Sequence, residues 1–158
     1  MTDPDQQALD PQEPDPQAPD PQKLAALHTR CFTMPRPWSA DEFTALLLSP
    51  HVFLVSDGPD SPAFALGRVV AGEAELLTIA TDPDQRRRGL ARRCLAGFDL
   101  QAKAMGADTA FLEVAAGNAA AIALYTACGW QGTGLRRGYY RAPDGSREDA
   151  QIMGKSLP

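Results

Sequence analysis

Residues 85–91, QRRRGLA, are the first candidate for a functional site in this sequence, because of their residue types and their order. The segment places three arginines and Gly89 between an apolar, strand-like run and a helix-like run. Backbone N–H groups at the start of a helix, close backbone approach at a glycine and arginine charge together favour a phosphate or pyrophosphate group. A solvated basic turn is the alternative. The segment matches neither a Walker A loop nor GxGxxG, so it does not indicate ATP or NAD chemistry.

Glu113 is the second candidate, because its carboxylate lies in an apolar, strand-like run, FLEVA at 111–115. This run follows the helix that begins after the arginines. A carboxylate in such a place can accept a proton, directly or through a water molecule. A glutamate that faces solvent from an edge strand is the alternative.

Asn118 and Tyr125 come next, at the two ends of a short alanine-rich run with helical character. Asn118 is well placed as the N-cap of that helix, and this structural role alone would account for it. Tyr125 falls seven residues later, two turns along the same helix face. A catalytic hydroxyl and a core tyrosine with a hydrogen-bonded hydroxyl are both open for Tyr125.

The three cysteines, Cys31, Cys94 and Cys128, are widely spaced and form no CxxC pair. They favour reduced, mostly buried thiols in a cytoplasmic protein. Neither His28 nor His51 lies near a cysteine in a recognisable arrangement. We therefore expect neither a metal site nor a nucleophilic cysteine.

The formal charge of −5 comes from one end of the chain of 158 residues. Residues 1–22 hold six acidic side chains and no Lys or Arg, whereas the rest of the chain holds 14 acidic and 15 basic side chains. A near-neutral body does not favour direct nucleic-acid binding, and no apolar run approaches the roughly 20 residues that span a bilayer. We expect residues 1–22 to be a disordered Asp/Pro/Gln-rich tail and residues 23–158 to form one domain without a membrane segment.

The elements that must position these candidates follow from hydrophobic period and turn chemistry. The segment Ser39-Ala40-Asp41-Glu42 reads as a capping box that opens the second helix. The pattern predicts helices at 23–32, 39–48, 90–105 and 119–128, and strands at 51–56, 63–70, 75–81, 109–115, 130–136 and 149–155. The first three strands are separated by short turns, which suggests an antiparallel meander. The order is α, α, β, β, β, α, β, α, β, β.

In combination, these residues resemble the GNAT acetyltransferases. QRRRGLA is similar to the family's acetyl-CoA loop, Q/R-x-x-G-x-G/A, and LEV followed by NAAAIALYTACGW is similar to its later strand and helix. The similarity is narrower still with the RimI-type ribosomal-protein-alanine N-acetyltransferases. It rests on LRRGYY at 135–140, DG at 144–145, EDA at 148–150, IM at 152–153 and PWS at 37–39, and it covers about residues 24–157.

The resemblance implies a role for each matching position. Acetyl-CoA would lie against the backbone of a strand, a pyrophosphate loop and one helix start: Ile79, Ala80, Thr81, Arg87, Arg88, Gly89, Leu90, Ala91, Arg92 and Asn118. Glu113 matches the general base, and Tyr125 matches the general acid that protonates the departing thiolate. The groove for the acetyl acceptor would be shaped by Trp38, Arg137, Tyr139 and Tyr140.

The resemblance also implies a fold and a reaction. The fold is an α+β, α/β/α-like GNAT domain with a mixed, mainly antiparallel central sheet flanked by about four helices. The reaction is direct acetyl transfer from acetyl-CoA to the N-terminal alanine α-amine of a small-subunit ribosomal protein, by an enzyme expected to be a monomer. An α-amine with a pKa near 8 is about 10% neutral at pH 7, so one modest base suits it better than lysine. A small-molecule amine or a protein lysine as acceptor, and a non-catalytic CoA-binding module, remain open alternatives.

Overall fold

The computed structural model describes residues 18–33 and 35–158. Its elements, in chain order, are α1 (Pro21–Cys31), α2 (Ala40–Leu47), β1 (Val52–Ser56), β2 (Ala63–Val70), β3 (Glu73–Thr81), the 3₁₀ turn η1 (Pro83–Gln85), α3 (Leu90–Ala104), β4 (Thr109–Ala115), α4 (Ala119–Ala127), β5 (Gln131–Arg141) and β6 (Arg147–Ser156). This order of helices and strands confirms the one predicted from the sequence. Within the described ranges no helix is both long and apolar enough to cross a bilayer.

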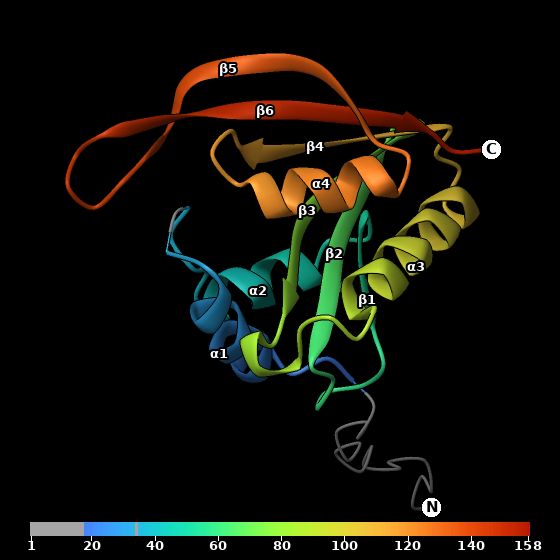
Figure 1. Ribbon diagram of the computed structural model, residues 1–158. Helices are drawn as coiled ribbons and strands as arrows, with labels where there is room; N and C mark the ends of the chain where they lie inside the picture. The colour runs from blue at the N-terminus through green and yellow to red at the C-terminus, as the bar shows by residue number, and fades with distance from the viewer. Residues whose placement is uncertain (1–17, 34) are drawn as a thin grey trace, which may run out of the picture.

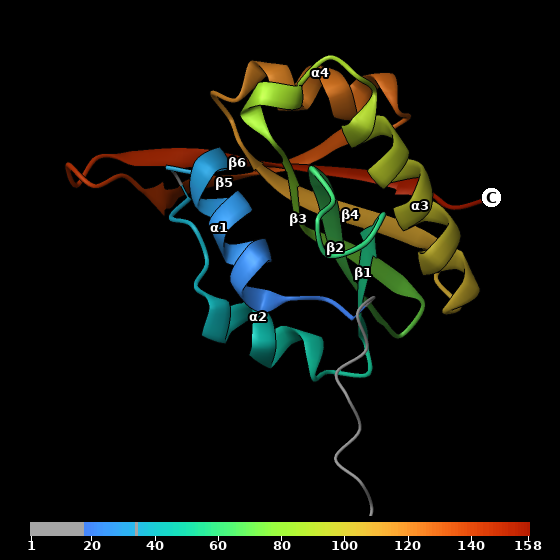
Figure 2. The same cartoon turned by 90° about the horizontal axis from the view of Figure 1, so that it is seen from below.

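One six-stranded sheet with the order β1-β2-β3-β4-β6-β5 organises the chain. All neighbouring strands are antiparallel except β3 and β4, which run parallel. Helices α1 and α2 cover one face of the sheet, and α3 and α4 cover the other (Figures 1 and 2). The mixed, mainly antiparallel sheet with its four helices confirms the predicted fold class.

Strand β2 shows why the sheet needs helices on both faces. Its side chains alternate between the two sides, as the strand period of two requires, yet both sets are buried. Ala65 packs into the core under α3 and α4, whereas Phe64 and Leu66 pack with Leu24 and Phe43 under α1 and α2. The two apolar cores hold β3, the neighbour of β2, from both sides.

The pairing between β3 and β4 is short. Only residues 73–75 of β3 face residues 109–111 of β4, and beyond this point the two strands separate. Strand β3 stays paired with β2 up to Thr81, with a register shift opposite Leu66 and Gly67. A gap therefore opens in the middle of the sheet toward the C-terminal ends of two parallel strands, which is where ligands bind in many open sheets.

Most element boundaries differ from the sequence prediction by one or two residues, and the differences in α1 and in the last two strands have a clear cause. Helix α1 begins at Pro21, two residues early, because the side chain of Asp20 accepts a hydrogen bond from the backbone of Gln22 and caps the helix. The rest of the expected tail, residues 1–17, lies outside the described residues. Strands β5 and β6 are longer than predicted, because a turn at Gly145 (φ +85°) joins them into one long hairpin.

Candidate functional site

A cleft of about 500 Å³ occupies the gap between β3 and β4. Its walls come from the second half of β3, the end of β4, the loop before α3, the start of α4 and the segment between α1 and α2. The elements of this cleft are far apart in the sequence, and the opening of the sheet brings them together. The cleft contains most of the residues that the sequence pointed to.

The edge of β3 that faces the cleft offers free backbone groups. Because β4 leaves β3 after residue 75, the backbone groups of residues 76–81 that point toward β4 have no strand partner. The predicted cofactor residues Ile79, Ala80 and Thr81 lie on this edge and line the cleft. An extended ligand with amide groups can therefore pair with β3 as a further strand would.

Helix α3 begins at one end of the cleft without a side-chain cap. The other three helices have capping side chains, from Asp20, Ser39 and Asn118, whereas the N-cap of α3 is Gly89 in the left-handed region at φ +73°. No acidic residue lies in the first turn of α3. Its first N–H groups and the positive end of its dipole are thus open to an anion.

The loop before α3 is bent by a second left-handed residue. Arg87 has φ +64°, which costs a non-glycine residue roughly 1–2 kcal/mol. Arg87 lines the cleft, as do Gly89, Leu90, Ala91 and Arg92. Arg88, which was predicted to bind the cofactor, lies between the two left-handed residues and does not line the cleft.

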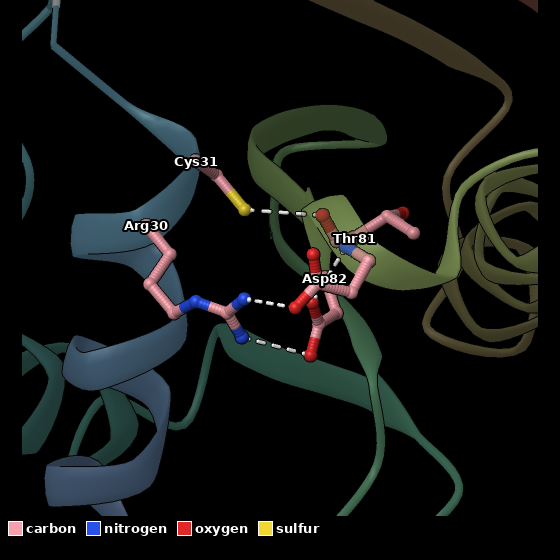
Figure 3. A network of polar contacts seen from close by, with 5 residues as sticks. Arg30, Cys31, Thr81 and Asp82 are labelled. Atoms are coloured by element: carbon pink, nitrogen blue, oxygen red, sulfur yellow. Dashed lines mark hydrogen bonds and ion pairs between the residues drawn. The ribbon is translucent and has the colours of Figure 1, made fainter.

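Helix α1 anchors the start of this loop (Figure 3). The two terminal guanidinium nitrogens of Arg30 donate hydrogen bonds to Asp82 and Asp84, each at 2.9 Å. The thiol of Cys31 donates to the carbonyl oxygen of Thr81 at 3.2 Å. Arg30 thereby neutralises the two carboxylates that stand next to the arginine loop, which favours an anionic ligand there.

Glu113 lies on β4 in the opposite wall, with its side chain 15% exposed. The Nε of Arg136, on β5, lies 3.1 Å from Glu113 Oε1 and forms an ion pair with it. The same guanidinium lies over the ring of Tyr139, 5.1 Å from its centroid. The carboxylate of Glu113 raises the pKa of Tyr139 by accepting a hydrogen bond from its hydroxyl and by its charge. The sequence placed Glu113 correctly beside a cleft but did not single out Arg136 as its partner.

Tyr125 projects from α4 into the same cleft and is buried. Burial raises its pKa to about 12, with a smaller contribution from Tyr140. Its phenol therefore keeps its proton over the whole physiological range and can donate a hydrogen bond or a proton. Tyr140 lines the cleft as well, and burial together with the charge of Glu113 raises its pKa to about 12.

Asn118 has the structural role that its position suggested, because its Oδ1 accepts a hydrogen bond from the backbone of Ala121 at 3.2 Å. It also lines the cleft at the start of α4. Trp38 lines the cleft from the segment before α2. Arg137 and Tyr139, predicted for the acceptor groove, do not line the cleft.

A bulge in β5 contains these two positions. Arg136 pairs with Ala150 and Tyr140 pairs with Glu148, so three residues of β5 lie opposite one residue of β6. Gly138 at the centre of the bulge has φ +60°. Arg137 and Tyr139 both lie in this bulge, whereas Tyr140, which lines the cleft, is paired with β6 again.

His28 is the site residue that the sequence analysis missed most clearly. It lines the cleft from α1, is 1% exposed and bonds to both Trp38 and Thr78. These partners lie 10 and 50 residues away in the chain, so no local motif marks them. Among the described residues no group of three or more His, Cys, Asp or Glu side chains is arranged to hold a metal ion.

Comparison with known proteins adds to this geometry. The profile of the Acetyltransferase (GNAT) family matches residues 22–130. The chain is 41% identical over 130 residues to the ribosomal protein bS18-alanine N-acetyltransferase of Escherichia coli K12, which covers 82% of this chain and 87% of that one. It is 39% identical over 137 residues to the N-alpha-acetyltransferase RimI of Mycobacterium tuberculosis, which covers 83% of both chains.

A solved structure agrees with these sequence relatives. The crystal structure of the ribosomal-protein-alanine N-acetyltransferase from Escherichia coli superposes with a TM-score of 0.76 at 37% identity. The superposition covers 87% of this chain and 88% of that chain. The resemblance predicted from the loop, strand and helix motifs is confirmed.

Proposed function

Because the chain belongs to the acetyltransferase (GNAT) family and is an N-acetyltransferase, we propose that it acetylates the N-terminal alanine α-amine of a small-subunit ribosomal protein. Enzymes of this family use acetyl-CoA, which is the proposed acetyl donor. The observation that carries the proposal is one cleft that joins a free strand edge, an uncapped helix start and the pair Glu113 and Tyr125. The names of the related enzymes support the choice of acceptor.

The residues of the cleft fit acetyl-CoA. Its pantetheine arm carries amides that suit the free edge of β3 at Ile79, Ala80 and Thr81. Its pyrophosphate suits the first N–H groups of α3 and the side chains of Arg87 and Arg92. Bound acetyl-CoA supplies an activated thioester to the middle of the cleft. Asn118 and the start of α4 close the other side.

Glu113 and Tyr125 then perform the two proton transfers. Glu113, directly or through a water molecule, accepts a proton from the α-ammonium group of the acceptor, whose amine attacks the thioester carbonyl. Backbone N–H groups of β3 stabilise the negative charge that develops on the carbonyl oxygen. Tyr125, whose pKa of about 12 keeps it protonated, donates its proton to the departing thiolate. No covalent acetyl-enzyme is needed.

The surroundings of Glu113 favour a cationic acceptor. Its carboxylate pairs with a guanidinium, that of Arg136, whose side chain is 52% exposed. An α-ammonium group can take this place at the carboxylate. Because the pKa of an α-amine is near 8, losing its proton there costs about 3 kcal/mol less than for lysine. This difference supports an N-terminal acceptor over a lysine side chain.

Acetyl transfer to two matched peptides, followed by mass spectrometry, tests the proposal. The first peptide carries the alanine-starting N-terminus of a small-subunit ribosomal protein, and the second is the same peptide with a blocked N-terminus and an internal lysine. We expect one acetyl group on the first peptide, at the α-amine, and none on the second. Acetylation of lysine in the blocked peptide, or of neither peptide while acetyl-CoA binds, would overturn the assignment to a ribosomal N-terminus.

A further inference from the structure

The ring of His28 lies between two walls of the cleft and bonds to each of them. Its Nδ1 accepts a hydrogen bond from the backbone N–H of Trp38 at 3.0 Å. Its Nε2 lies 2.9 Å from the hydroxyl oxygen of Thr78 on β3. The mechanism described above uses none of these three residues for a proton transfer.

The two contacts determine where the proton of the ring lies. A backbone N–H can only donate, so Nδ1 of His28 must carry a lone pair. The proton is then on Nε2, which donates to the hydroxyl of Thr78, and the ring is neutral. Burial lowers the pKa of His28 to about 4, against a weaker opposing effect of the charge of Glu42, so this neutral form persists at physiological pH.

Aromatic side chains hold the ring in this orientation. It stacks on Phe32 at a centroid distance of 4.2 Å and lies 5.1 Å from the ring of Trp38. Phe43 and Phe64 pack around it at 5.4 and 6.4 Å. A ring so enclosed cannot turn over without disturbing its neighbours, so the two hydrogen bonds keep a fixed direction.

A buried histidine with satisfied nitrogens is often only part of a core. Here both of its partners, as well as His28 itself, line the cleft. Loss of either hydrogen bond would therefore disturb the wall that faces the ligand, in addition to the apolar core beneath it. This placement separates His28 from a residue that serves stability alone.

The bond to Trp38 acts on the acceptor side of the cleft. The β5–β6 hairpin carries Arg136 and Tyr140, and Tyr140 lines the same cleft as Trp38. Trp38 belongs to the described part of that segment, 35–39, which joins α1 to α2. The position of this segment therefore contributes to the shape of the cleft that Trp38 and Tyr140 both line.

We propose that His28 is a positioning residue for the acceptor. Its two hydrogen bonds fix the position of the segment at Trp38 relative to β3 at Thr78. The proposal rests on the proposed function, because it assumes that the acceptor peptide enters between this segment and the β5–β6 hairpin. His28 acts on the acceptor only through the position of Trp38 and takes no part in the proton transfers. Its loss should weaken acceptor binding and leave the binding of acetyl-CoA nearly unchanged.

Two substitutions of His28 separate the effects of its two hydrogen bonds. The Oδ1 of Asn lies the same number of bonds from Cα as Nδ1 of histidine, so His28→Asn keeps an acceptor for Trp38. The Nε2 of Gln corresponds in the same way to Nε2 of histidine, so His28→Gln keeps a donor for Thr78 but leaves the N–H of Trp38 unpaired. Both variants remove the aromatic ring, so both lose the same stacking on the neighbouring aromatic side chains.

The experiment measures KM for the alanine-starting peptide, KM for acetyl-CoA and kcat for the wild type and both variants. In His28→Gln, we expect the peptide KM to rise about tenfold, with kcat and the acetyl-CoA KM within about twofold of the wild type. His28→Asn should restore most of the peptide KM. Equal changes in all parameters for both variants, or an unchanged peptide KM in His28→Gln, would overturn the proposal.

The outcomes distinguish this proposal from the proposed function. If the wild type does not acetylate the peptide, the proposed function fails and the role of His28 fails with it. If the wild type acetylates the peptide and His28→Gln equals it, only the role of His28 fails. Should His28→Gln not fold, the ¹⁵N spectrum of the histidine rings in the wild-type protein decides, because a proton on Nδ1 of His28 at pH 7 would contradict the bond to Trp38.

Discussion

The two ends of the cleft are built in different ways. At the cofactor end, the loop and first turn of α3 are consecutive in the chain, from Gln85 to Arg92, and their polar groups are mostly exposed. At the acceptor end, the groups come from α1, the segment before α2, β4 and β5. Here the ring of His28 is almost fully buried, and Glu113 is paired with Arg136.

This difference shows where specificity can change. At the proposed cofactor end, the groups that face the ligand are backbone N–H groups and arginine side chains, and Arg30 anchors the loop from α1. At the proposed acceptor end, the groups that face the ligand are side chains from several separate elements, such as those of His28, Glu113 and Tyr140. One cleft can therefore keep its donor while its acceptor changes.

Removal of the hydroxyl of Tyr125 should have the largest effect and should leave the cofactor end intact. Tyr125→Phe takes away the proposed proton donor to the thiolate, so we expect kcat to fall about 10²-fold or more. Steady-state kinetics measure kcat, and calorimetric titration measures the affinity for acetyl-CoA, which should stay within about twofold. A kcat close to that of the wild type would remove Tyr125 from the mechanism.

Lowering the pH should destabilise the acceptor end through His28. Its pKa is about 4 in the folded protein and 6.5 in a model peptide, so the unfolded chain binds more protons between these values. The free energy of unfolding should therefore fall by about 3 kcal/mol as the pH drops from 6.5 to 4. Well above pH 6.5 the ring is neutral in both the folded and the unfolded chain, so the full stability is present there.

Urea unfolding of the wild type and of His28→Asn at several pH values measures this contribution. The variant lacks the titrating ring, so its free energy of unfolding should depend less on pH in this range. The difference between the two proteins should then shrink as the pH falls toward 4. Parallel pH profiles for both proteins would show that His28 does not titrate as described.

A small change at Gly89 should affect the cofactor end alone. A Cβ at Gly89 meets no atom within 4 Å, but φ +73° is strained for alanine by about 1 kcal/mol. We expect Gly89→Ala to raise the KM for acetyl-CoA roughly fivefold. Alanine disfavours the left-handed conformation at this position, so the loop must return to it at a cost in free energy when acetyl-CoA binds.

Gly145 provides the matched control for this substitution. It has φ +85°, a Cβ there also meets no atom within 4 Å, and it lies in the turn of the β5–β6 hairpin. Gly145→Ala should lower stability by a similar amount and leave the acetyl-CoA KM unchanged. Similar KM values for the two variants would mean that the loop conformation at Gly89 does not matter for the cofactor.

The sequence predicted the cofactor end better than the acceptor end for a physical reason. Turns, caps and helix starts depend on neighbouring residues, so Gly89 and Asn118 could be placed from their local context. The exact element order, including the bounds of β2 and β4, followed from the same local rules. Arg88 is the exception, because the direction of a loop side chain depends on the backbone angles of its neighbours.

The acceptor end required the three-dimensional structure. Arg136 pairs with Glu113 and Tyr140 lines the cleft, and no local pattern indicates the bulge that lies between these two residues. His28 has no sequence signal that separates it from an ordinary core histidine. Its place between Trp38 and Thr78 depends on how α1 packs against β3, which local patterns do not determine.

We propose that one cleft binds acetyl-CoA at one end and uses Glu113 as the proton acceptor for an α-amine at the other. Glu113→Gln tests this arrangement when two quantities are measured together: the calorimetric affinity for acetyl-CoA and the rate of acetyl transfer to the alanine-starting peptide. We expect an affinity within about twofold of the wild type and a rate lower by about 10²-fold. A wild-type rate in Glu113→Gln, or a loss of acetyl-CoA binding that accounts for the lower rate, would contradict it.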